Sequence, residues 1–139
     1  MRPAIWVFLG GLLAAAAVAL GAIGAHVLQA DLAPRQLETF HTAVQYQMYH
    51  ALGLVLIGAL GLHHQSRWFD VGGWLMLLGI LLFSGFLYAW VATGSRFFVH
   101  PVPVGGVAFI AGWLMLAIGA IGLGSNPRSC GALVRDEID

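Results

Sequence analysis

The stretch TAVQYQMYHALGLVLIGALGL, from Thr42 to Leu62, joins a polar segment to an uninterrupted apolar one. Its second half, from Ala51 onward, carries no charge and is typical of a helix inside a membrane. Its first half holds two glutamines, two tyrosines and a histidine, which is more polar than an ordinary membrane-spanning segment. The stretch therefore predicts a membrane helix whose entry half is polar.

The composition of the whole chain fits this setting. Apolar residues make up 60% of the 139 residues, charged residues 9%, and the mean hydropathy is +0.86. The formal net charge is zero, so nothing indicates a nucleic-acid partner. The one cysteine, Cys130, excludes an intramolecular disulfide and a thiolate metal cluster.

Four stretches are apolar over roughly the 20 residues that a spanning helix needs. The first is longer than the apolar core of a secretory signal, so we expect it to persist as a permanent helix. Short loops make neighbouring helices antiparallel. The sequence predicts an all-α membrane protein, an antiparallel four-transmembrane-helix bundle in a single domain (1–139), with spans at 4–25, 43–62, 71–92 and 104–124 and a polar tail at 125–139.

The arginines favour one orientation, because cytoplasmic loops are enriched in positive charge. The N-terminus, the second loop and the tail hold four arginines, and the first and third loops hold two. These are Arg2, Arg67, Arg128 and Arg135 against Arg35 and Arg96. This bias predicts that both termini lie in the cytoplasm.

The second helix is expected to begin well before its apolar span, because Pro34 suits a first helical turn. A helix from Pro34 to Leu62 is about 42 Å long, which exceeds the roughly 30 Å hydrocarbon core. At 100° per residue its polar side chains form one stripe, and apolar residues lie opposite. The stripe comprises Glu38, His41, Thr42, Gln45 and Tyr49, and Gln47 is expected to point away from it.

His50 lies deep in the predicted span, where a polar group left unpaired is costly. We expect it to face the bundle and to have a partner. The candidate residues for a packing or ligand site are His26, His41, Gln45, Tyr46, Tyr49 and His50. They are interpreted as interhelical hydrogen-bonding groups, as a site for a quinone-like molecule, metal or haem, or as a proton or ion path.

Small residues predict close helix contacts. Ala17, Gly21 and Ala25 form a small-xxx-small ridge in the first span, and Ala108 and Gly112 form another in the fourth. Such ridges are expected to face neighbouring helices.

Motifs for catalysis or cofactor attachment are missing from the sequence. Ser84 stands alone in its span, and G-x-S-x-G, H-E-x-x-H and C-x-x-C-H do not occur. His26, His41 and His100 have no diagnostic metal spacing. The sequence predicts neither an enzyme nor a resident metal or cofactor.

Three motifs carry a family resemblance: GAIGAHVL (21–28), FHTAVQYQMYHALGLVLIG (40–58) and PVPVGGVAFIAGWLMLAIG (101–119). Together they resemble the YgdD-like family, a domain-of-unknown-function group of small four-helix proteins in bacterial inner membranes. The resemblance implies a membrane location and no established activity, and it matches His26, Gln45, Tyr46 and His50 to the family motifs. The family usually has a threonine where this chain has Val102, so no hydroxyl role is implied there.

Three functions are compatible with these patterns. The favoured one is a structural or accessory subunit that packs in a homo-oligomer or a larger membrane complex, with the lipid bilayer and other membrane subunits as its partners. The alternatives are a ligand-binding module that uses the histidine, glutamine and tyrosine cluster, and a transporter or channel for small solutes.

Overall fold

The computed structural model describes residues 2–122, and all of its regular structure is helical. Four described stretches are long and apolar enough to cross a membrane, which confirms the predicted fold class. The predicted tail at 125–139 lies outside the described residues. The elements are α1 (Pro3–His26), η1 (Leu28–Ala30), α2 (Pro34–His63), α3 (Arg67–Gly79), η2 (Ile80–Gly85), α4 (Phe86–Thr93), η3 (Arg96–Val99) and α5 (Val102–Ile121).

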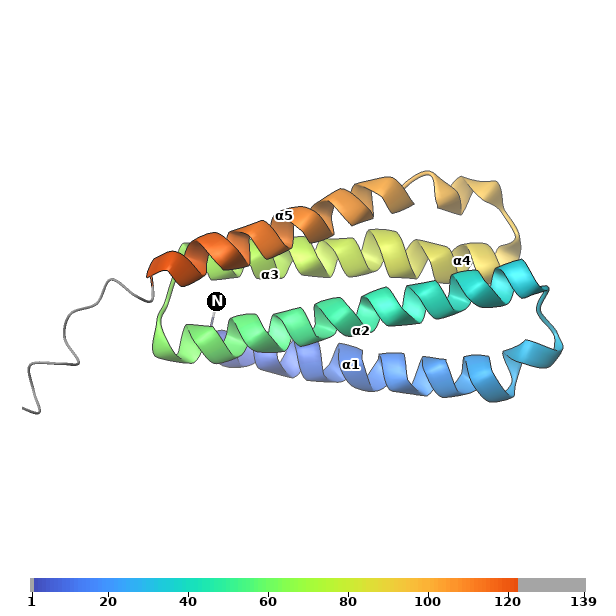
Figure 1. Cartoon of the computed structure of the whole chain (residues 1–139), viewed down its shortest axis with the longest axis horizontal. Coiled ribbons are helices and arrows are strands. Elements are labelled where there is room, and N and C mark those ends of the chain that lie inside the picture. Colours follow the sequence, from blue (N-terminus) through green and yellow to red (C-terminus); the bar gives the residue numbers. More distant parts are fainter. Residues whose placement is uncertain (1, 123–139) are drawn as a thin grey trace, which may run out of the picture.

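The helices form two antiparallel pairs (Figure 1). α1 packs along α2, and the rod formed by α3, η2 and α4 packs along α5. α2 joins the pairs, because it also contacts α3, η2 and α4. The start of α1 and the end of α5 lie at the same end of the bundle as the α2–α3 turn.

Local signals explain where two of the helices begin. α2 starts at Pro34, whose missing N–H costs nothing in a first turn. α3 starts at Arg67, four residues before the expected span, because the Ser66 side chain accepts a hydrogen bond from the Trp68 backbone N–H. The capped turn brings Asp70 into the helix, so the third rod carries a carboxylate that the predicted span excluded.

Glycines allow α1 and α2 to touch through their backbones. A Cβ on Gly10 would lie 2.6 Å from the Ala51 carbonyl oxygen, and a Cβ on Gly58 would lie 2.8 Å from the Val7 amide nitrogen. The ridge expected on α1 is therefore partly wrong, because Ala17 is buried but Ala25 is exposed. The buried small residues of α1 are Gly10, Ala17 and Gly24, since seven residues make two helical turns and return to the same face.

The ridge expected on α5 is confirmed. Ala108 and Gly112 are buried, and a Cβ on Gly112 would lie 2.9 Å from Met76 Cγ on α3. The core shared by the helix pairs consists of Trp6, Leu54, Ile57, Phe69, Met76, Ile80, Phe109 and Leu116.

The third rod is interrupted by a π-helical segment, η2, which the sequence did not predict. Such segments are short and often lie at functional sites. η2 buries Ser84 completely, and Ser84 Oγ is the one enclosed side-chain polar atom without a partner in the part of the chain described. Phe83 of η2 lies against Gly105 of α5, where a Cβ would come 2.6 Å from the Phe83 amide nitrogen.

Candidate functional site

Gln45, Gln47 and His50 of α2 lie near the middle of that helix. α2 spans 30 residues, and its midpoint falls between Met48 and Tyr49. At 1.5 Å per residue, Gln45 and His50 are about 5 Å and 2 Å from the midpoint along the axis. Both therefore lie inside the roughly 30 Å hydrocarbon region of a bilayer that the helix spans.

Gln47 is the most connected side chain of this group. It is 4% exposed, its amide nitrogen donates to the Leu13 carbonyl oxygen of α1 at 2.9 Å, and its Oε1 accepts from the Tyr88 hydroxyl of α4 at 3.0 Å. One side chain thus links three helices in a medium without water.

The sequence reasoning missed this role by treating Gln47 only as the residue outside the polar stripe. A signal was present, because Phe40, Ala43, Gln47, Ala51 and Leu54 recur at intervals of three and four residues. All five are buried on one face of α2. The interruption of a buried apolar face by one amide was the clue to an interhelical hydrogen bond.

His50 faces the bundle and has the expected partners. It is 4% exposed, and its Nδ1 lies 2.7 Å from the Tyr46 carbonyl oxygen. Its ring is parallel to that of Phe109 on α5, with 3.3 Å between centroids and 11° between planes. His50 therefore attaches α2 to α5 through ring stacking.

Tyr46 lies beside His50, with 6.1 Å between ring centroids, but the other two candidate histidines do not gather around it. His26 is the last residue of α1 and is exposed, and His41 is also exposed. Gly24 lies against Phe40 and His41 of α2, so His26, two residues further along α1, lies near Glu38, about 18 Å along the axis from His50 at 1.5 Å per residue. A haem held by His26 and His50 is therefore incompatible with the fold. Among the described residues, no three His, Cys, Asp or Glu side chains are grouped to hold a metal ion.

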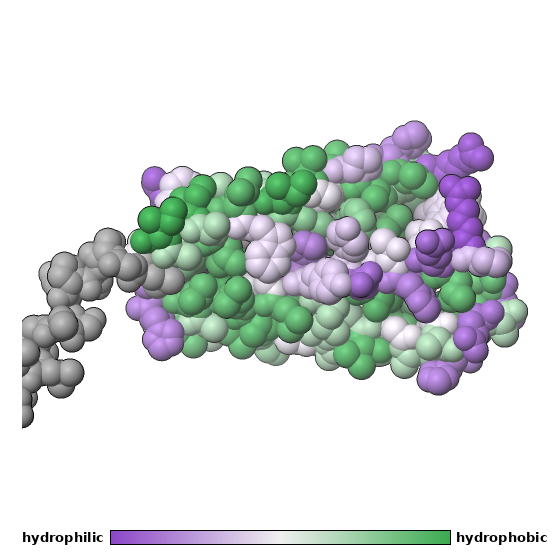
Figure 2. Space-filling model, viewed as in Figure 1, coloured by the Kyte–Doolittle hydropathy of each residue, from purple (hydrophilic) through white to green (hydrophobic). Residues whose placement is uncertain are grey.

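Most of the predicted polar stripe lies on the outer surface of the bundle. Thr42 is half-buried and donates to the Glu38 carbonyl oxygen of its own helix. The other four residues, Glu38, His41, Gln45 and Tyr49, are exposed, and we call them the α2 stripe. Figure 2 shows polar side chains over α2 that reach from the end of the molecule toward its middle, with apolar surface on both sides. Gln45 Nε2 lies 2.6 Å from the Tyr49 hydroxyl oxygen, and Gln45 Oε1 has no partner among the described residues.

A cavity of about 300 Å³ opens beside this stripe, between α2 and α5. Tyr46 stacks on Phe83 of η2 at 4.6 Å between centroids, and His50 stacks on Phe109. The lining is almost entirely aromatic and apolar: Tyr46, His50, Phe83, Gly106, Phe109, Ile110 and Trp113.

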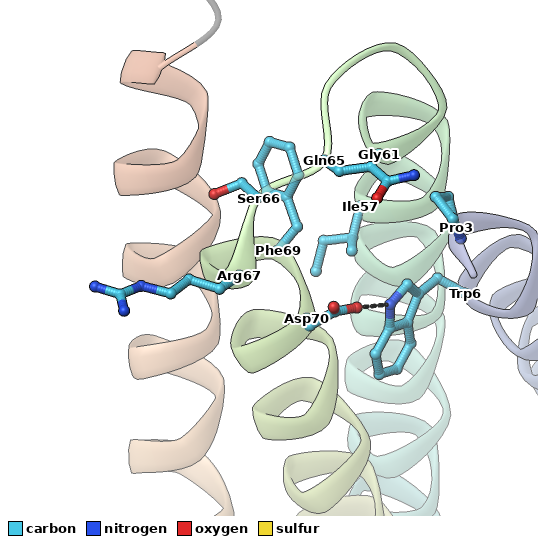
Figure 3. Close-up of a pocket in the computed structure, with 9 residues that line it drawn as sticks. All are labelled: Pro3, Trp6, Ile57, Gly61, Gln65, Ser66, Arg67, Phe69 and Asp70. Carbon is cyan, nitrogen blue, oxygen red and sulfur yellow. Dashed lines mark hydrogen bonds between the residues drawn. The ribbon is translucent and has the colours of Figure 1, made fainter. Parts of the chain in front are cut away.

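A second cavity, of about 250 Å³, lies at the end of the bundle near the α2–α3 turn (Figure 3). Trp6 Nε1 of α1 donates to Asp70 Oδ1 of α3 at 2.8 Å, and the Trp6 ring meets Trp74 edge to face. No residue of this cavity was among the sequence candidates. The Trp6–Asp70 contact ties the first helix to the third and satisfies the indole N–H near the membrane surface.

The comparisons with known proteins identify a family of membrane proteins. Residues 20–106 match the family described as protein of unknown function, DUF423. The UPF0382 membrane protein YwdK of Bacillus subtilis is 41% identical over 122 residues, covering 84% of this chain and 96% of its own. The UPF0382 inner membrane protein YgdD of Escherichia coli is 38% identical over 106 residues, covering 76% of this chain and 81% of its own. No solved structure matches significantly.

Proposed function

This chain belongs to the DUF423 family of proteins of unknown function, and from that premise we propose that it is a packing subunit of a membrane homo-oligomer. The family assignment confirms the resemblance drawn from the sequence motifs, and the relatives are named as membrane proteins. The observation that carries the proposal is the α2 stripe, which presents an incompletely hydrogen-bonded amide to the hydrocarbon region.

The lipid environment favours burial of Gln45 and Tyr49 against another protein, because acyl chains offer these side chains no hydrogen bonds. Both residues are exposed on the monomer, and their contact uses one amide N–H and the phenol oxygen. Hydrogen bonds of this kind between membrane helices are worth about 0.6 to 2 kcal/mol each. Burial against another helix therefore lowers the free energy of the exposed pair.

A second copy of the chain supplies matching chemistry. Under a twofold axis along the membrane normal, each residue and its counterpart lie at the same depth, and residues next to the axis contact their own counterparts. A glutamine amide both donates and accepts, so two copies of Gln45 complement each other. We therefore favour α2 packing against α2 of another protomer, a role that requires no catalysis.

Cysteine cross-linking in native membranes tests this arrangement. In a Cys130→Ser background, oxidised Gln45→Cys is expected to yield a cross-linked dimer. Val18→Cys is the matched control, because Val18 is 63% exposed on α1 and, like Gln45, lies about 5 Å from its helix midpoint at 1.5 Å per residue. Equal cross-linking at both positions would overturn the proposal. A Gln45→Cys adduct with a different protein would instead indicate a subunit of a larger complex.

We also propose that the chain lies in the bacterial inner membrane with both termini in the cytoplasm. The Escherichia coli relative is named an inner membrane protein, which supports the same location for this chain. The arginine bias supports termini in the cytoplasm.

A further inference from the structure

His50 lines the cavity between α2 and α5, and its Nε2 has no hydrogen-bond partner among the described residues. We propose that this cavity binds a hydroquinone or related phenolic ring dissolved in the bilayer, whose hydroxyl donates to Nε2. This inference goes beyond the packing role, because the cavity faces α5 and the α2 stripe does not line it.

The backbone carbonyl of Tyr46 determines which ring nitrogen of His50 donates a hydrogen bond and which one accepts. Nδ1 lies 2.7 Å from the Tyr46 carbonyl oxygen, which only accepts, so Nδ1 carries the proton. In a neutral imidazole Nε2 then has a lone pair and no hydrogen. No described residue donates to it, and it is not among the fully enclosed atoms, so it remains open to a ligand.

The aromatic side chains that line the cavity favour a ligand with a flat ring. Tyr46 with Phe83 and His50 with Phe109 form two stacked pairs, and Trp113 lies 6.2 Å from the His50 ring between centroids. Aromatic groups prefer offset or edge contacts with other rings. About 300 Å³ is at the small end of ligand cavities, which suits a single substituted ring.

The cavity opens toward lipid, so its ligand is expected to be lipid-soluble. Its rim includes Ile110, which is 65% exposed, and Trp113, which is 40% exposed, so it opens on the surface that lipid covers. Both residues lie within two positions of the α5 midpoint, between Ala111 and Gly112. The ligand therefore enters from the hydrocarbon region, and the oxidised quinone binds poorly because its carbonyl oxygens only accept.

Gly106 provides a way to close the cavity without disturbing the fold. It lines the cavity, and a Cβ there would meet nothing within 4 Å. A leucine side chain at this position projects into open space. Gly11 on α1 also has nothing within 4 Å of its Cβ and does not line the cavity, so Gly11→Leu is the matched control.

The test titrates the full-length chain in lipid nanodiscs, under argon, with decyl-substituted dimethoxy-methyl-benzohydroquinone while tryptophan fluorescence is followed. The wild type and Gly11→Leu are expected to show saturable quenching, and Gly106→Leu only the linear quenching of a probe dissolved in lipid. The dimethyl ether of the probe, which has no hydroxyl, is expected to bind about tenfold more weakly.

His50→Phe separates the hydrogen bond from the stacking. Phenylalanine keeps a ring against Phe109 but has no Nε2, so the hydroquinone and its ether are expected to bind alike, both about tenfold more weakly than the hydroquinone binds the wild type. Circular dichroism confirms that each variant is helical. Linear quenching in the wild type, saturable quenching in Gly106→Leu, or tighter hydroquinone than ether binding in His50→Phe would each overturn the proposal. Cross-linking at Gln45 in the Gly106→Leu background reports on the packing role separately.

Discussion

At the scale of single residues, Gln47 and Gln45 show how one side-chain type has two roles on one helix. Gln47 is enclosed and bonded to α1 and α4, whereas Gln45 is exposed and bonded only to its own helix. Two residues of sequence separate them, which is about 200° around a helix and places them on opposite sides. Gln47 stabilises the monomer, and Gln45 is available for the contact that we propose with a second copy of the chain.

Removal of the Gln47 bridge is expected to destabilise the fold. Gln47→Leu loses the bond to the Leu13 carbonyl and leaves the Tyr88 hydroxyl without its acceptor, so the free energy of unfolding should fall by about 1–2 kcal/mol. Unfolding in mild detergent, followed by circular dichroism, measures this change.

Tyr88→Phe and the double variant provide the control for that measurement. Because the two residues share one hydrogen bond, the double variant should lose about 1 kcal/mol less than the sum of the single variants. Additive losses would show that the Gln47–Tyr88 bond contributes nothing to stability.

At the scale of elements, the α1–α2 pair depends on backbone contact at glycines. Gly10 lies against the Ala51 and Val55 backbone, and Gly58 lies against the Pro3 and Val7 backbone. Close approach of this kind replaces the hydrophobic effect as a driving force between helices surrounded by lipid. The adjacent Gly11 has open space and takes no part.

Adjacent glycines on α1 should therefore respond in opposite ways to the same substitution. Gly10→Ala places a Cβ 2.6 Å from a carbonyl oxygen, which forces the helices apart and should cost about 1–3 kcal/mol. Gly11→Ala should leave stability unchanged or raise it by up to about 1 kcal/mol through helix propensity. Thermal unfolding in detergent measures both variants. Equal stability of the two would contradict close packing of α1 on α2.

At the scale of the whole molecule, charged residues lie at both ends of the bundle. Arg67 and Asp70 lie at one end with the start of α1, whereas Arg35 and Arg96 lie at the other end with the start of α5. The one cysteine, Cys130, follows α5 in the chain and serves as a native probe of the end where α5 finishes.

The proposed orientation predicts which end a thiol reagent reaches. In intact spheroplasts a membrane-impermeant maleimide should leave Cys130 unlabelled until the membrane is permeabilised, because the tail is expected in the cytoplasm. Ser95→Cys in a Cys130→Ser background should be labelled without permeabilisation, since Ser95 is exposed in the loop between α4 and η3. The reverse pattern would invert the topology.

Much of the fold was predictable from the sequence, and less of the site. Apolar segments of spanning length and the proline before α2 are local signals, so the helices could be located from them. The faces of the helices were harder, because nearly every residue of a spanning segment is apolar and the lipid-facing side resembles the core. Ala25 was therefore placed on a packed face that Gly24 occupies, and Gln47 was overlooked.

The sequence by itself determined a membrane location, helical structure and family membership, because hydrocarbon requires every backbone group to bond within its own helix. It also determined that α2 carries polar groups at membrane depth. Only the tertiary structure decided which of them are satisfied, since this depends on the helices beside each one. Contact with α1 and α4 encloses Gln47, stacking on α5 holds His50 at the edge of a cavity, and the absence of a neighbouring helix in the described monomer leaves Gln45 and Tyr49 on the surface.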